Sequence, residues 1–492
     1  MRGPRDPEAL AALALAAIAG LRVLFFALAF PFFSNVDEHR HVDMALKYER
    51  GYVPGRGDDA YEAQTLRLVG ILGSPEYHRD PLRTDPVPPP VWRAGPELAD
   101  RRLASARASL GSHHNLEANQ SPAYYALAGA WLRLGRALGL DGGRLLYWLR
   151  ALAAPATAAL VLATHRGLRG VYARSRFVRL GAPALVAFLP QDCVYYATGD
   201  SLSPLLGGLA FLGIVDLALR ASPGWVRGAA TGLVSAAAIL TKLPNALLAG
   251  VALFCTLAAV RATPRPRRGA WLSFWAGLAL PVGAWLLRNQ LLLGDPTGDA
   301  LKIETLGWGL RPLAEWPLHP LLGFRGLTAF LAELTRTFWR GELAWLRVPL
   351  AHASADALYV GVSAVGLTLA AVGLRGARPR TERLAEGAAW AALAAALAIL
   401  VWLSLRFSYG PSTNPSLERP WFANGRLVAG ALVPFALLFV RGLEQAGALL
   451  PVRWRERAAW TALGGVCAAA SLSEAILSAP VVASAYNAFH LP

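Results

Sequence analysis

The sequence predicts an all-α protein that crosses a membrane many times. The chain has 492 residues, of which 55% are hydrophobic and only 16% are charged, and its mean hydropathy is +0.37. A soluble domain carries about 25% charged residues, so this composition excludes a water-soluble globular fold. Many apolar stretches also approach the roughly 20 residues that a helix needs to cross the hydrocarbon core, where the backbone must bond to itself.

The positive charge of the chain indicates membrane topology. Lys and Arg number 48 against 32 Asp and Glu, which gives a net charge of +16. The arginines fall in short clusters between apolar runs, not along one face, so nucleic acid is not an expected partner. The four clusters lie at residues 166–179, 261–268, 375–383 and 441–457. By the positive-inside rule, these clusters face the cytoplasm.

The first crossing is predicted within residues 1–33, over residues 8–33. Its apolar run is too long for a signal peptide, so we expect an uncleaved helix. Further crossings are predicted at residues 123–138, 145–164, 180–196, 202–219, 228–240, 245–260, 271–287, 355–374, 388–405, 427–440 and 459–477. The basic cluster at 166–179 requires an odd number of crossings after residue 121, but two candidates precede it. The expected count is therefore 11 to 13.

Three polar segments are expected on the extracytoplasmic side. Residues 34–121 form the first; they hold thirteen acidic against eleven basic residues and five of the nine histidines. Residues 289–354 form the second, which is rich in Trp and Pro, and residues 407–425 form a third. The transmembrane core is then expected over residues 122–288, and the C-terminal transmembrane helices over residues 355–492.

Asp37 and Glu38 begin a dense run of ionisable residues, Asp37-Glu38-His39-Arg40-His41, directly after the first crossing. One interpretation is a solvated helix N-terminus, capped by Ser34 or Asn35, in which both acids complement the helix dipole. The other is a carboxylate at the bilayer edge that acts as a general base on a lipid-borne substrate. His41 lies one turn after Asp37, so these two residues could also hold a divalent metal ion.

The three cysteines give no further site. Cys193, Cys255 and Cys467 are far apart and form no CxxC pair, so neither a disulfide framework nor a thiolate zinc site is predicted.

Several motifs, in order along the chain, resemble the GT-C class of polytopic glycosyltransferases. The class includes polyprenyl-phosphate-sugar-dependent enzymes of the aminoarabinose transferase and protein O-mannosyltransferase types, and allied uncharacterised bacterial membrane proteins. The matching segments are DEHRH (residues 37–41), EANQSPAYY (117–125), TGD (198–200), LTK (240–242), LRN (287–289), GDPTG (294–298), FWRGELAW (338–345) and GRL (425–427). The resemblance implies a GT-C-like helix bundle with a long first extracytoplasmic loop that contains short helices.

The resemblance also implies a reaction and its residues. A sugar would move from a polyprenyl-phosphate donor to an envelope acceptor, whose identity is not encoded in these motifs, by one inverting displacement at the extracytoplasmic face of the plasma membrane. Asp37 would be the base, and Glu38 the second choice or an aid to positioning. The expected substrate-binding residues are His41, Glu117, Gln120, Tyr124, Asp200, Lys242, Arg288 and Arg426. Arg and Lys suit the leaving phosphate because they stabilise its charge.

Plainer interpretations of these residues stay open. Lys242, Arg288 and Arg426 could be interfacial anchors, Asp200 could be a helix cap, and Tyr124 could lie in the interfacial aromatic belt. Two other functions also remain: a transporter or lipid flippase, since ionisable residues in helices mark substrate paths, and a non-catalytic scaffold that retains the GT-C frame. Against transport, we find no internal repeat of two halves.

Overall fold

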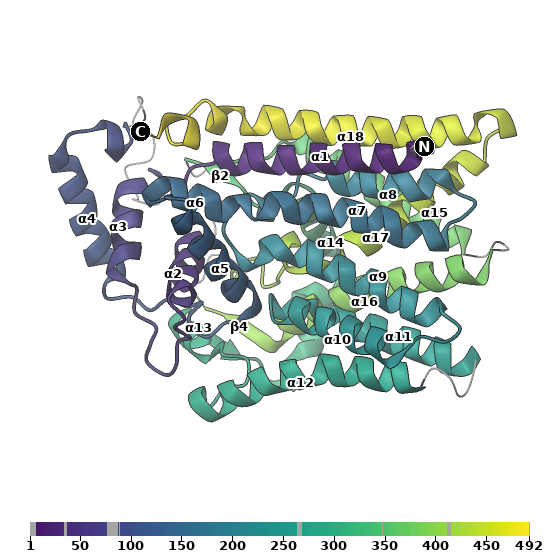
Figure 1. The fold of residues 1–492 in the computed structure, drawn as a ribbon, viewed down its shortest axis with the longest axis horizontal. Helices are drawn as coiled ribbons and strands as arrows, with labels where there is room; N and C mark the ends of the chain where they lie inside the picture. Colours follow the sequence, from purple (N-terminus) through teal and green to yellow (C-terminus); the bar gives the residue numbers. More distant parts are fainter. Residues whose placement is uncertain are drawn as a thin grey trace.

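The computed structural model shows a helical bundle with an additional helical layer at one end (Figure 1). It describes residues 6–33, 37–75, 87, 89–262, 268–346, 348–374, 376, 378–410 and 415–491. The longest helices run side by side along the long axis of the molecule. The predicted all-α polytopic membrane fold is confirmed.

Eight segments of the described chain are long and apolar enough to cross a membrane. They comprise α1 (Pro7–Ala29), α6 and α7 together (Gly142–Val171), η3 with α9 (Gly199–Leu219), α12 (Arg268–Leu293), α15 (Ala353–Gly373), α16 (Arg380–Arg406), η7 with α17 (Gly425–Ala448) and α18 (Val452–Val482). Three predicted crossings coincide with shorter helices: α8 (Arg176–Phe188), α10 (Trp225–Ile239) and α11 (Leu247–Ala262). The described chain thus has eight helices that meet the length and apolarity of a span, and the predicted count of 11 to 13 requires these shorter helices to cross as well.

The crossing expected at residues 123–138 is corrected by the structure. This segment forms α5 (Ala123–Ala137), which lies beside α2 (Glu38–Glu49) at one end of the bundle, whereas the short helices α8, α10 and α11 lie along it (Figure 1). It lies against α2, and a Cβ atom at Gly129 would come 2.7 Å from the backbone nitrogen of Glu49. If α5 does not cross, the chain crosses the membrane once between residue 121 and the basic cluster at 166–179. This odd number places the cluster on the cytoplasmic side, as the positive-inside rule requires.

Close helix packing in the bundle depends on glycine. Helices α10 and α12 pack so closely that side chains larger than glycine would clash between them. A Cβ at Gly228 would lie 2.0 Å from the carbonyl oxygen of Ala270, and one at Gly232 would lie 2.2 Å from that of Phe274. Small residues let backbones approach in this way where no hydrophobic effect drives helices together. The most buried crossing is α17, with η7 before it.

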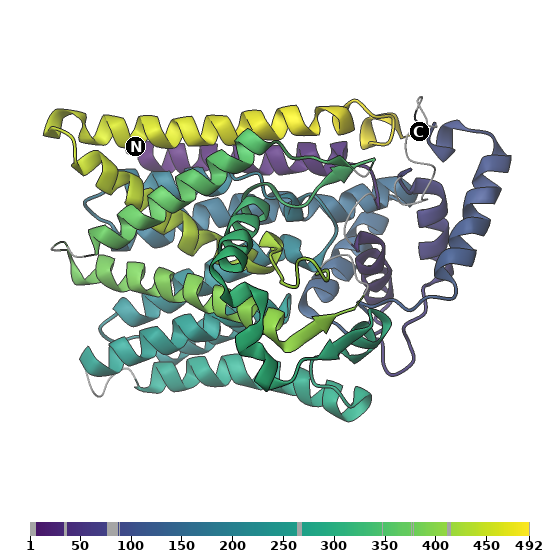
Figure 2. The same cartoon turned by 180° about the vertical axis from the view of Figure 1, so that it is seen from behind.

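One end of the bundle, which we call the Asp37 end, carries several shorter elements (Figures 1 and 2). These are α2, α3 (Ala63–Leu72), η1 (Val91–Arg93), α4 (Pro96–Leu110), α5, α13 (Ala300–Thr305) and the C-terminal η8 (Ala488–His490). After α13, the chain passes through η5 (Leu313–Leu318) and η6 (Pro320–Leu322) into α14 (Phe324–Arg340), which lies nearer the middle of the bundle. Two small antiparallel sheets join them: β1 (Trp308–Leu310) pairs with β4 (Phe407–Tyr409), and β2 (Ala344–Trp345) with β3 (Val348–Pro349). The N-terminus of α1 lies at the opposite end.

Candidate functional site

Asp37 stands at the position before α2 without capping it. Its carboxylate makes no capping hydrogen bond to the helix, and it pairs instead with Arg40 one turn later at 2.8 Å. The side chain remains 32% exposed. Ser34 and Asn35, the alternative caps, lie outside the described residues. The geometry therefore does not favour a simple capping role for Asp37.

Glu38 lies in a closed ion pair. Its two carboxylate oxygens accept hydrogen bonds at 2.7 Å from Nε and Nη2 of Arg150, and neither side chain is exposed. The backbone N–H groups of Phe33 and Ala197 also donate to it, at 3.1 and 3.0 Å. Arg150 in turn donates to the carbonyl oxygens of Ala27, Phe30 and Pro31. This is the arrangement of a structural ion pair, and it leaves Asp37 as the stronger candidate for the base.

Around Asp37, residues from distant parts of the chain meet in two groups of ion pairs. In the first, Lys302 Nζ of α13 lies 3.0 Å from Glu117 Oε1. In the second, Asp200 Oδ2 lies 3.3 Å from Lys242 Nζ and 3.6 Å from Arg426 Nη1. We call Asp37 and these five residues the Asp37 cluster.

The cations of the Asp37 cluster are accessible and their partner carboxylates are not. Side chains of Lys242, Arg426 and Lys302 are 21%, 22% and 26% exposed, whereas those of Asp200 and Glu117 are 0% and 4% exposed. The buried carboxylates therefore hold the three cations from behind and leave their outer faces to a ligand. Such a set of fixed cations suits an anion, above all a phosphate.

The charges around Asp37 and Glu117 keep these two carboxylates ionised. Burial raises the pKa of Asp37, but the charges of Arg40, Lys302 and Arg426 outweigh it and hold the pKa well below its ordinary value. Burial likewise raises the pKa of Glu117, and Lys302 with its neighbours lowers it to about 2. Asp37 is therefore a carboxylate at neutral pH, as a general base must be.

His41 lies beside the cluster as a neutral imidazole. Burial lowers its pKa to about 4, although Glu117 nearby favours the charged form. Its Nδ1 lies 2.8 Å from the hydroxyl of Tyr125, and its ring meets Tyr124 edge to face at 6.3 Å between centroids. No group of three or more His, Cys, Asp or Glu side chains that could hold a metal ion occurs among the described residues. Asp37 and His41 therefore belong to no such group within the described chain, and a metal ion between these two residues stays a prediction.

Besides His41 and Tyr124, two more predicted binding residues lie outside the Asp37 cluster. Arg288 stacks on the ring of Trp285 at 4.7 Å, donates to Asn289 Oδ1 at 2.9 Å and binds the carbonyl oxygen of Pro54. Gln120 donates to Asp299 Oδ1 at 2.8 Å, which fastens the segment after residue 117 to the one before α13. These contacts hold parts of the chain together, and a substrate role for either residue stays a prediction.

Sequence reasoning missed Lys302 and Glu342. Lys302 enters the cluster because α13 folds back over residues 117–120, where a Cβ at Gly298 would lie 2.4 Å from the carbonyl oxygen of Asn119. Glu342 Oε2 lies 3.1 Å from Nε of Arg426. The one signal available was that Lys302 is among only three lysines in the chain.

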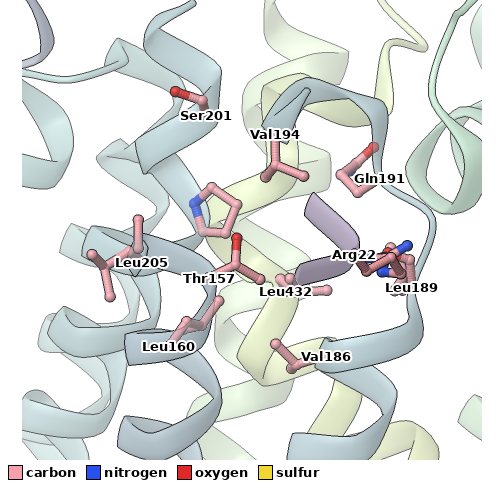
Figure 3. Close-up of a pocket in the computed structure, with 12 residues that line it drawn as sticks. Arg22, Thr157, Leu160, Val186, Leu189, Gln191, Val194, Ser201, Leu205 and Leu432 are labelled. Carbon is pink, nitrogen blue, oxygen red and sulfur yellow. The ribbon is translucent and has the colours of Figure 1, made fainter. Parts of the chain in front are cut away.

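The bundle also contains a pocket beside Arg22 of α1, shown in Figure 3. Its lining includes Arg22, Thr157, Gln191 and Ser201, and Arg22 pairs there with Glu474 of α18 at 2.7 Å. None of the predicted site residues lines this pocket. We therefore assign the candidate site to the Asp37 cluster.

Comparisons with known proteins place the fold. No protein-family model and no curated protein sequence matches the chain. The solved structures similar to this chain include the oligosaccharyltransferase AglB from Archaeoglobus fulgidus in complex with an inhibitory peptide and a dolichol-phosphate, and the A. fulgidus oligosaccharyltransferase in the apo form. Each superposes with a TM-score of 0.50 at 12% identity, covering 96% and 97% of this chain.

The chain spans 56% of the length of each of these neighbours. At 12% identity the likeness concerns the fold alone, and the neighbours' own reactions and ligands belong to them. The sequence motifs and the superposition agree on one architecture. The chain is a multi-pass membrane protein whose fold is similar to that of these oligosaccharyltransferases.

Proposed function

We propose that the protein is a GT-C glycosyltransferase that moves a sugar from a polyprenyl-phosphate donor to an extracytoplasmic envelope acceptor. The observation that carries the proposal is the Asp37 cluster: one accessible, ionised carboxylate among three accessible cations, at one end of a GT-C-like bundle. The chemistry needs these two elements together, a base for the acceptor and positive charge for the departing phosphate.

The reaction would be one displacement. Asp37 accepts the proton of an acceptor hydroxyl or amine as its oxygen or nitrogen attacks the anomeric carbon. The bond from that carbon to the phosphate oxygen breaks, and its electron pair leaves with the lipid phosphate. Lys242 and Arg426, with Lys302 across the cluster, stabilise the phosphate charge as it develops.

Asp200 supports the phosphate ligands from the protein side. Its Oδ2 faces Lys242 and Arg426, and its side chain has no exposed surface. In the proposed reaction, Asp200 therefore holds these two cations in place.

The fold neighbour adds support for a lipid carrier. One of the two oligosaccharyltransferase structures contains a dolichol-phosphate and a peptide. The arginine clusters at residues 166–179 and 441–457 connect helices at the end of the bundle opposite Asp37 (Figure 2). We therefore propose that the Asp37 cluster faces the extracytoplasmic side of the plasma membrane.

Reconstitution tests this function. The purified full chain in liposomes, given undecaprenyl-phosphate hexose labelled in the sugar and a cell-envelope extract, should release undecaprenyl phosphate and label an extract component. Arg426→Met should lose most of this transfer. Movement of the labelled lipid between leaflets without transfer would instead assign the chain to the flippases, and neither activity with any hexose or pentose donor would contradict the proposal.

A further inference from the structure

Two motifs that are far apart in the sequence pack directly against each other. The segment Gly425-Arg426 meets the end of α14, where the backbone N–H of Gly425 donates to Thr337 Oγ1 at 2.9 Å. Thr337 Oγ1 in turn lies 2.7 Å from the carbonyl oxygen of Ala423. A Cβ at residue 425 would lie 2.1 Å from the backbone nitrogen of Phe338, so no other residue fits without a shift of the backbone. The start of η7 is thereby fixed on α14.

The chain leaves α14 through a turn that only glycine tolerates. Gly341 has φ of +77°, and a Cβ there would lie 1.8 Å from the carboxyl carbon of Asp192. Asp192 Oδ2 accepts a hydrogen bond of 2.8 Å from the backbone N–H of the next residue, Glu342. Arg340, on the other side of the turn, pairs with Asp356 of α15 at 2.6 Å. The backbone at Glu342 is therefore held on both sides.

The side chain of Glu342 reaches Arg426. Its Oε2 lies 3.1 Å from Arg426 Nε, and its Oε1 accepts a hydrogen bond from Asn424. Arg426 Nη1 lies 3.6 Å from Asp200 on its other side. Two carboxylates from separate elements thus hold one guanidinium. An unrestrained Arg side chain has many rotamers and loses conformational entropy when it binds a ligand. Contacts that already fix the side chain reduce this entropy cost.

We propose that Glu342 is a positioning residue, which holds Arg426 in the orientation that receives the phosphate of the lipid-linked donor. The turn at Gly341 and its contact with Asp192 place Glu342 for this role. The inference rests on the proposed function, because it takes Arg426 as the ligand of the departing phosphate. It explains why the FWRGELAW segment, which supplies no member of the Asp37 cluster, is built so tightly against the GRL segment.

A double-mutant cycle tests the inference. We expect Glu342→Gln to lower kcat about tenfold and to change the donor KM less than about threefold, since the attraction of the guanidinium remains and its alignment is lost. If Glu342 acts through Arg426, the double variant Glu342→Gln with Arg426→Lys should be no slower than Arg426→Lys alone. Additive losses would overturn the inference.

The control is Glu333→Gln. Glu333 lies on the same helix, α14, and its carboxylate also faces an arginine, Arg419, at 3.5 Å, but outside the Asp37 cluster. We expect wild-type kcat for this variant. Should Glu342→Gln fail to fold, Asn424→Leu removes the donor to the other oxygen of Glu342 and can replace it in the same cycle. If Glu333→Gln lowered kcat as much as Glu342→Gln does, the inference would also be overturned.

Binding of undecaprenyl phosphate is measured by thermal stabilisation of the purified protein. It distinguishes a failure of the proposed function from a failure of the role of Glu342. A wild type that neither binds this lipid nor transfers sugar would remove the proposed function, and the inference with it. A wild type that does both, with additive losses in the cycle, would remove only the role of Glu342.

Discussion

Asp37 and Glu38 are neighbours in the sequence and lie in opposite environments. Glu38 is fully buried, and its carboxylate is saturated by Arg150 and two backbone N–H groups. Asp37 is about a third exposed, pairs with Arg40 of α2 and also faces cations of other elements, Lys302 and Arg426. The difference arises because successive residues at a helix start point about 100° apart, so one carboxylate enters the core and the other faces the cluster.

This contrast shows how the same chemical group takes two roles. The Glu38–Arg150 pair joins the end of α1, the start of α2, α6 and the segment before η3, and so it fixes the frame on which Asp37 stands. A closed pair of this kind cannot exchange a proton with a substrate without breaking. Asp37 is in no such closed pair, and the charges of Arg40, Lys302 and Arg426 keep it ionised, as the proposed base must be. Four variants test the contrast.

Asp37→Asn should have the largest effect on activity. Loss of the general base is expected to lower kcat about 10³-fold, while the amide keeps the shape of the side chain and the melting temperature stays within about 2 °C. Sugar release from the labelled donor measures the rate. Asp141→Asn is the matched control, because Asp141 also precedes a helix, α6, without capping it. Transfer at the wild-type rate by Asp37→Asn would show that Asp37 is not the base.

Glu38→Gln should act on stability. Removing one partner of a buried pair leaves Arg150 charged and uncompensated, which costs about 3–5 kcal/mol in the free energy of unfolding. Thermal denaturation in detergent measures the loss. The exposed pair of Asp216 and Arg220 provides the comparison, and Asp216→Asn should cost less than about 1 kcal/mol. Equal losses in the two variants would contradict the structural role of Glu38.

Lys302→Met should have an intermediate effect that depends on pH. Lys302 lowers the pKa of both Asp37 and Glu117, so its removal raises both values. Because only ionised Asp37 accepts a proton, the loss of activity on the acid side should begin at a higher pH than in the wild type. At pH 7 we expect kcat to fall about tenfold, and Lys302→Arg to retain most of it. An unchanged pH profile would place Lys302 outside the site.

Arg288→Leu should have the smallest effect. Its guanidinium lies on Trp285 and binds the loop at Pro54, away from the cluster. We expect kcat and the donor KM to change less than about threefold, and stability to fall by about 1 kcal/mol from the lost stacking. A tenfold rise in the donor KM would return Arg288 to the set of phosphate ligands that the sequence motifs indicate.

The sequence predicts the class of fold and much of the cluster because both depend on local patterns. Apolar length and arginine placement report crossings, and Asp37, Glu117, Asp200, Lys242 and Arg426 stand in motifs at the ends of helices. Residues whose role depends on tertiary contact could not be found in this way. Lys302 reaches Glu117 only because α13 folds over residues 117–120, and Glu38 is distinguished from Asp37 only by the position of Arg150.

The crossing count shows the same limit. Residues 123–138 are apolar enough to resemble a span, yet α5 carries Arg133 and Arg136, and Arg136 pairs with Glu49 of α2. A helix whose charged residue pairs with a neighbouring helix at the end of the bundle is stabilised there instead of across the membrane. Composition alone does not contain that partner.

The central claim is that Asp37 performs chemistry while its neighbour Glu38 holds the frame. The most direct test measures sugar transfer and melting temperature side by side for wild type, Asp37→Asn and Glu38→Gln, with rates normalised to folded protein. The account predicts that Asp37→Asn melts as the wild type does and loses transfer, and that Glu38→Gln melts lower while its folded fraction keeps most of its transfer. The reverse pattern, an inactive but stable Glu38→Gln and an active Asp37→Asn, would contradict it.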